Sequence, residues 1–298
     1  MIKFKHLFLV GIISLITYAC GSDGVAVDNF DHTAQAVKDN DTLVKFFKNH
    51  YYDVTESIVK PLVDGETALF DDPKLNSQSV TETINGDDIN YTLYSYVTQQ
   101  GTSTKGFPTV VDSVLVNYSG KRILNGENLS ENDFDSNNNL WFVLGSGVIR
   151  GWSYGVPNVK GGENVTLPNE PLTFSGTGKV LLFIPSGLAY RNIGSGSIQA
   201  NENLMFTIEL LDIVVDTDID GDGIPGILED LDGDGIPWND DTDENGIVNF
   251  LDRDDDGDGV LTINEDANKD GDPRNDFSDP ENPTLPDYLN INIRVSNE

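Results

Sequence analysis

A repeat of about twelve residues near the C-terminal end most restricts how this chain can fold. Each copy places Asp or Asn at its first, third and fifth positions, Gly at the sixth and a carboxylate near the twelfth. Full copies begin at Asp218, Asp230, Asp241 and Asp254, and a partial copy begins at Asp266. Because this segment contains few apolar residues, it cannot be stabilised by a large hydrophobic core of its own.

Alternating oxygen ligands, a Gly at a sharp turn and a late carboxylate are typical of loops that bind Ca²⁺. The pattern predicts structural calcium ions, and the candidate ligands are Asp218, Asp220, Asp222, Glu229, Asp230, Asp232, Asp234, Asp241, Asp243, Asn245, Asp252, Asp254, Asp256, Asp258 and Glu265. Pro225 and Pro237 at the eighth loop position argue against the exiting helix of an EF-hand. The array instead resembles the calcium repeats of thrombospondin type 3. The alternative is a disordered acidic linker, although random acidic sequence would not keep Gly at the sixth position of four copies.

The chain is strongly acidic, and its acidic residues are unevenly distributed. It contains 50 acidic and 18 basic residues, which gives a formal net charge of −32. About half of the acidic residues lie between 216 and 287. Nucleic acid is therefore excluded as a partner, because phosphate binding requires a basic face.

The first nineteen residues have the pattern of a secretory signal. Lys3 and Lys5 precede the apolar run 7–19, which is too short to cross about 30 Å of hydrocarbon as a helix. We therefore expect residues 1–19 to be a signal peptide of an exported protein. The alternative is a buried helix of a cytosolic protein.

Cys20 is the only cysteine of the chain, and it directly follows this apolar run. The sequence Ile-Thr-Tyr-Ala-Cys at 16–20 resembles a bacterial lipobox, although Thr17 and Tyr18 depart from the usual residues. The resemblance implies lipidation of Cys20, contact with a membrane through that lipid, and a location in the bacterial cell envelope, at the outer membrane. An ordinary signal peptide followed by an incidental cysteine is the alternative. A single cysteine excludes an internal disulfide.

The remaining chain divides by its patterns into four parts. Residues 20–87 are predicted to be a lipid-anchored tether with a short helical region at 36–60, capped by Asp41 or Thr42, followed by loop. Residues 88–214 contain β-branched and aromatic runs that predict strands, with a short helix near 148–155. The acidic repeats occupy 215–280, and a C-terminal segment follows at 281–298.

Six short strings within 88–214 resemble the FKBP-type peptidyl-prolyl cis-trans isomerase family in their order and spacing. They are VNYSG (116–120), FDS (134–136), FVLGSGVIRGW (142–152), GGE (161–163), IPSGLAY (184–190) and NLMFTIELL (203–211). The resemblance implies an α+β fold, in which a bent antiparallel β-sheet wraps around one short helix, with the irregular repeat tail beyond it.

The family resemblance also implies an apolar pocket between sheet and helix, formed by Tyr118, Phe134, Asp135, Phe142, Val148, Ile149, Trp152, Tyr190 and Phe206. Trp152 would form the floor, while the Ile149 amide and the Tyr190 hydroxyl would hold carbonyl groups of the substrate. Asp135 would orient its neighbours. The implied activity is rotation about X–Pro bonds in exported, proline-containing polypeptides, which breaks no bond and requires no cofactor for catalysis.

Several residues around this expected pocket depart from the family. Arg191 replaces the usual Gly, Leu140 replaces a Phe, the usual Ile-Pro-Pro reads Ile-Gln-Ala at 198–200, and 164–178 is an insertion. These differences keep a second hypothesis open: a catalytically weak or inactive envelope protein that uses the same fold to bind proline-containing partners.

Overall fold

The computed structural model describes residues 29–294. The predicted signal peptide and Cys20 lie outside the described residues. Among the helices that are described, none has the length and apolar character needed to cross a membrane.

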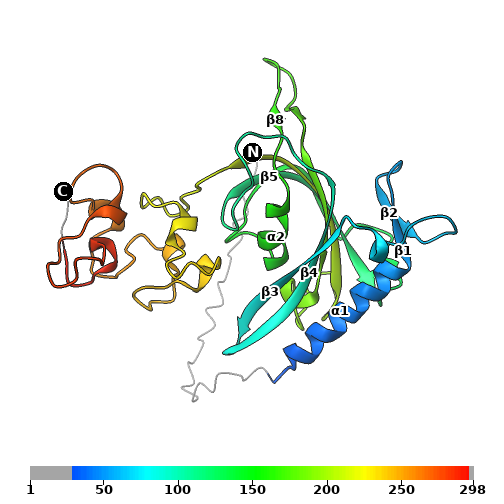
Figure 1. The fold of residues 1–298 in the computed structure, drawn as a ribbon, viewed down its shortest axis with the longest axis horizontal. Coiled ribbons are helices and arrows are strands. Elements are labelled where there is room, and N and C mark those ends of the chain that lie inside the picture. Colours follow the sequence, from blue (N-terminus) through cyan, green and yellow to red (C-terminus); the bar gives the residue numbers. More distant parts are fainter. Residues whose placement is uncertain (1–28, 295–298) are drawn as a thin grey trace, which may run out of the picture. The chain divides into compact units, whose positions relative to one another are not determined.

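The central element is a seven-stranded antiparallel sheet that curves around one short helix (Figure 1). The helix is α2 (Arg150–Gly155), as the sequence predicts for this region. Along the sheet the strands follow in the order β3 (Leu75–Ile84), β4 (Asp87–Gln99), β10 (Gly178–Ile184), β11 (Asn203–Val214), β5 (Ser113–Leu124) and β6 (Asn128–Leu129), and β7 (Asp135–Val143) also pairs with β5. Two small hairpins lie outside this sheet: β1 (His50–Asp53) with β2 (Ile58–Pro61), and β8 (Glu163–Asn164) with β9 (Phe174–Ser175).

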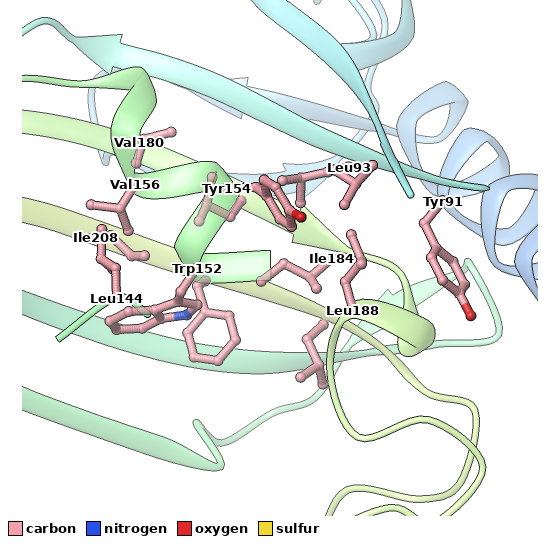
Figure 2. Close-up of a cluster of buried hydrophobic side chains, with 14 of the residues drawn as sticks. Tyr91, Leu93, Leu144, Trp152, Tyr154, Val156, Val180, Ile184, Leu188 and Ile208 are labelled. Atoms are coloured by element: carbon pink, nitrogen blue, oxygen red, sulfur yellow. The ribbon is translucent and has the colours of Figure 1, made fainter. Parts of the chain in front are cut away.

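The concave face of the sheet packs against α2 and forms the larger hydrophobic core (Figure 2). Side chains of a strand alternate between faces, so Leu182 and Ile184 of β10 both point into this core. The helix lies very close to them: a Cβ on Gly151 would be 2.4 Å from Ile184, and one on Gly155 would be 2.6 Å from Leu182. Glycine at these positions lets the helix approach the strand.

The opposite face of the sheet is covered by α1 (His32–Lys48), shown in blue in Figure 1. Phe46 and Phe47 of this helix pack against Phe183, the β10 residue that points away from α2, and all three are fully buried. A buried carboxylate adds a polar link, because Asp39 accepts a hydrogen bond of 2.7 Å from the Ser186 hydroxyl. Both faces of β10 are therefore buried, which explains its continuous apolar sequence.

The structure differs from the sequence prediction before residue 88. The helix begins after Asp31, whose carboxylate accepts from the amide of Ala34 at 2.8 Å, and it ends at Lys48, so Asp41 and Thr42 lie inside it. Residues 50–61 form the β1–β2 hairpin instead of more helix. Residues 75–84, expected to be loop, form β3 and pair with β4, so the predicted boundary at 88 divides one hairpin.

The acidic repeats form turns and short 3₁₀ helices in the described part of the tail. These helices are η4 (Gly226–Glu229), η5 (Pro237–Asn239), η6 (Asn249–Leu251), η7 (Thr262–Asn264), η8 (Pro273–Asn275) and η9 (Asp287–Leu289). The sixth-position glycine of each copy has a positive φ, from 84° to 101°, at Gly223, Gly235, Gly246, Gly259 and Gly271. In every copy its amide donates to the carboxylate of the first Asp at 2.7–3.1 Å. The local loop geometry therefore follows from the repeat.

Candidate functional site

A cavity of about 140 Å³ opens between the concave face of the sheet and the start of α2. Its walls contain Gly147 and all nine residues that the family resemblance assigns to the pocket: Tyr118, Phe134, Asp135, Phe142, Val148, Ile149, Trp152, Tyr190 and Phe206. The volume is well below the roughly 300–1,000 Å³ of pockets for drug-sized ligands. The cavity therefore has the size for a single side chain rather than for a large cofactor.

The floor and walls of this cavity are aromatic. The Trp152 ring is 3% exposed and meets the rings of Tyr118, Phe142 and Phe206 edge-on, at centroid distances of 5.1, 5.4 and 5.2 Å. Phe134 meets Phe206 edge-on at 5.4 Å. Such edge-to-face contacts hold the rings in fixed orientations. Among the described residues the buried Trp152 Nε1 has no hydrogen-bond partner.

One polar pair lies on the cavity wall. The Tyr118 hydroxyl donates to Oδ2 of Asp135 at 2.7 Å. Burial and this acceptor together raise the pKa of Tyr118 to about 12. Burial and the charge of Asp135 also raise the pKa of Tyr190. Both phenols therefore keep their protons, and with them the ability to donate, at neutral pH.

Gly120 explains how the rings approach so closely. It lies on β5 opposite both Phe206 and Asp135, and a Cβ at this position would be 2.6 Å from Phe134 and 2.7 Å from Phe206. The sequence analysis did not assign Gly120 to the site. A Gly within a strand was the available signal, because it often marks a close approach by another group.

The residues that depart from the family do not line this cavity. Arg191 lines a separate cavity together with Glu82 and Arg150, and its backbone adopts a φ of 53°. Leu140 pairs with Val116 within the sheet, while the insertion forms the β8–β9 hairpin.

The tail contains four groups of three carboxylates whose ligand atoms lie within 4.8 Å of one another. Three groups match the predicted loops: Asp218, Asp220 and Asp222; Asp230, Asp232 and Asp234; and Asp254, Asp256 and Asp258. The fourth combines Asp222 and Glu229 with Asp255, which the sequence analysis did not select because it occupies a non-ligand position of its own loop.

The remaining predicted ligands are placed as follows. Glu265 is fully buried, and burial together with the charges of Asp256 and Asp258 raises its pKa to about 9. In the third loop, the Asn245 amide donates to Asp252 at 2.7 Å. Among the described residues, no carboxylate group within 4.8 Å includes the predicted ligands of that loop, Asp241, Asp243 and Asp252.

The pKa values of the first loop and of Asp255 from the fourth loop reflect the crowding of these acids. Burial and the neighbouring carboxylates raise the pKa of Glu229 to about 10, and that of Asp255 to about 8. Burial and the charge of Asp222 raise the pKa of Asp220 to about 7. Carboxylates brought together in this way repel one another unless a cation or protons neutralise them.

Comparisons with known proteins match two parts of the chain. A family model for FKBP-type peptidyl-prolyl cis-trans isomerase matches residues 104–174, and a model described as BamM C-terminal matches residues 219–290. The FKBP-type isomerase FkpA of Escherichia coli is 36% identical over 106 residues, which cover 36% of this chain and 33% of FkpA. FK506-binding protein 2 of Debaryomyces hansenii is 34% identical over 103 residues, which cover 34% of this chain and 64% of that protein.

Two solved structures are also similar. The crystal structure of Escherichia coli FkpA aligns with 31% identity and a TM-score of 0.31, over 45% of this chain and 51% of that one. A peptidyl-prolyl isomerase of Pseudomonas syringae aligns with 26% identity and a TM-score of 0.30, over 48% and 82% of the two chains. The chain thus spans about a third of the length of its curated Escherichia coli relative. The sequence of the central domain, which builds the aromatic cavity, therefore matches the FKBP-type peptidyl-prolyl cis-trans isomerase family.

Proposed function

We propose that the central domain catalyses cis-trans rotation about X–Pro bonds in exported polypeptides. The observation that carries this proposal is the aromatic cavity of about 140 Å³ with its Tyr118–Asp135 pair. Amide resonance imposes a rotation barrier of about 18–20 kcal/mol. A site that favours the twisted amide over the planar one lowers this barrier without forming or breaking a covalent bond.

Each part of the cavity has a role in this mechanism. The buried rings of Trp152 and Phe206 hold the proline ring and exclude water. The planar amide is the more polar form, so loss of water destabilises it relative to the twisted form. The Ile149 amide and the Tyr190 hydroxyl bind substrate carbonyls, and Asp135 orients the hydroxyl of Tyr118.

Neighbouring residues of β7 provide a matched test of catalysis. Phe142 lines the cavity, whereas Trp141 is 46% exposed and does not. Exchange of a proline-containing peptide should be fast with the wild type and with Trp141→Leu, and much slower with Phe142→Leu. A folded wild-type protein with no rate above the uncatalysed one would favour binding without catalysis. Equal loss in both variants would contradict the site.

We also propose that the tail binds calcium ions that stabilise its loops. The buried carboxylates of Glu229 and Glu265 support this, because neither has a hydrogen-bond partner in the described part of the chain. A calcium chelator should make 216–276 sensitive to protease while 31–214 stays resistant. The control is the same chelator saturated with calcium. Unchanged cleavage of the tail would contradict the proposal.

We further propose that the mature chain is anchored in the cell envelope through a lipid on Cys20. The position of this cysteine after the apolar run 7–19 supports the proposal. Expressed in bacteria, the wild type should incorporate labelled palmitate and sediment with membranes, and Cys20→Ser should do neither. A wild type that carries no label would refute the anchor.

A further inference from the structure

A group of buried carboxylates connects the first acidic loop to the fourth. Asp222 and Glu229 belong to the first loop, while Asp255 comes from the fourth. Their ligand oxygens lie within 4.8 Å of one another, and the three residues are 0%, 1% and 1% exposed. Three acids that meet from distant parts of the chain, away from water, must be neutralised by a cation or by protons.

The hydrogen bonds of Asp222 and Asp255 use only one oxygen of each carboxylate. Asp222 accepts from the Ile224 amide through Oδ1 at 2.8 Å, and Asp255 accepts from the Thr262 hydroxyl through Oδ2 at 2.8 Å. Their other oxygens, and both oxygens of Glu229, are buried and have no hydrogen-bond partner among residues 29–294. In Asp222 and Asp255 one carboxylate oxygen is thus fixed by a hydrogen bond within the protein, and the other is free to act as a ligand, as are both oxygens of Glu229.

We propose that Asp255 completes the cation site of the first loop, so that one calcium ion clasps the first and fourth repeats together. The inference rests on the calcium proposal for the tail. Ca²⁺ takes six to eight oxygens, often including a bidentate carboxylate, and Glu229 offers two oxygens to it. Asp220 of the same loop has a further buried oxygen, Oδ2, without a hydrogen-bond partner among the described residues, and its ligand atom lies within 4.8 Å of those of Asp218 and Asp222. An all-oxygen, carboxylate-rich site favours Ca²⁺ over softer metals.

The proposed calcium ion would also affect the contact between the repeats and the central domain. Phe250, which shortly precedes Asp255, is 1% exposed, and a Cβ added at Gly226 or Gly145 would lie 3.2 or 3.1 Å from it. A Cβ at either glycine would also meet the side chain of Val111, which precedes β5. Glu229 follows Gly226 in the chain, and Asp255 follows Phe250. A cation bound by both carboxylates therefore holds these two segments together at the apolar contact, and its binding stabilises the attachment of the repeats to the domain.

Hydrogen–deuterium exchange of the full chain in calcium distinguishes this clasp from a set of independent loops. Asp255→Asn keeps one oxygen ligand but removes a charge. It should speed exchange at 222–229 at least tenfold, although these residues are distant in sequence. Glu229→Gln should act reciprocally on 250–258. Asp232→Asn, with the same charge change in the second loop, should speed exchange only within 230–241.

Added calcium should restore slow exchange at 222–229 in the Asp255→Asn protein, because weaker binding is overcome by mass action. Native mass spectrometry should show one ion fewer for this variant at limiting calcium. If Asp255→Asn affects only 254–265, or if excess calcium does not rescue it, the clasp is refuted while calcium binding stands. If calcium protects no part of the wild-type tail, both proposals fail.

Discussion

The hydrogen bond between Tyr118 and Asp135 allows a quantitative test of the proposed site. Tyr118→Phe removes the donor, and Asp135→Asn removes the charge of the acceptor, with little change in shape. A hydrogen bond to a charged group contributes about 1.5–3 kcal/mol. Asp135 is exposed, so we expect solvent to reduce this to about 1–2 kcal/mol.

At about 1.4 kcal/mol for each factor of ten, this predicts that either substitution lowers kcat/KM by about 5- to 30-fold. The double variant should be no slower than the slower single variant, because both changes remove the same bond. The assay is proline-isomer exchange, and urea unfolding of each variant checks that the fold is intact. Multiplicative losses in the double variant would show that the two side chains act independently, which would refute the reasoning.

Three further predictions concern packing, the tail and pH. Gly120→Ala should lower the free energy of unfolding by about 1–3 kcal/mol and slow isomerisation, because the added Cβ would collide with the rings of Phe134 and Phe206. Urea unfolding and the exchange assay measure these two effects, and a variant of wild-type stability would contradict the prediction. The Arg150 guanidinium carbon lies 3.9 Å from the centroid of the Trp238 ring, so Trp238→Ala should weaken attachment of the tail by about 1 kcal/mol. Faster proteolysis of the repeats would reveal this loss, and an unchanged cleavage rate would exclude a role for the contact. Burial raises the pKa of Asp39, so the folded state holds this proton more tightly than the unfolded state; its contribution to stability is present below pH 4 and is lost as pH rises through the folded pKa. Asp39→Asn should therefore gain stability relative to the wild type between pH 4 and 7 in urea titrations, and a constant difference would disprove the linkage.

Much of the pocket could be predicted from sequence because its residues lie in ordered motifs. All nine proposed lining residues border one cavity, although they come from β5, β7, β11, α2 and the segments around Val148, Phe134 and Tyr190. The N-terminal region was predicted less well. The expected cap near Asp41 is inside α1, and the polar strand β3 has no strong alternation to reveal it. Its pairing with β4 supplies the hydrogen bonds that define it as a strand.

The sequence by itself determined the features that depend on neighbours in the chain. The loop turns of the tail are of this kind, because Gly223 and its equivalents bond to an Asp five residues earlier. Tertiary structure alone decided the features that depend on distant partners. Asp255 joins Glu229 only because the repeats fold back on each other, and Phe183 and Leu182 enter different cores because α1 and α2 cover opposite faces of one strand. Periodicity records which residues share a face, but the partner on that face is set by packing across the whole fold.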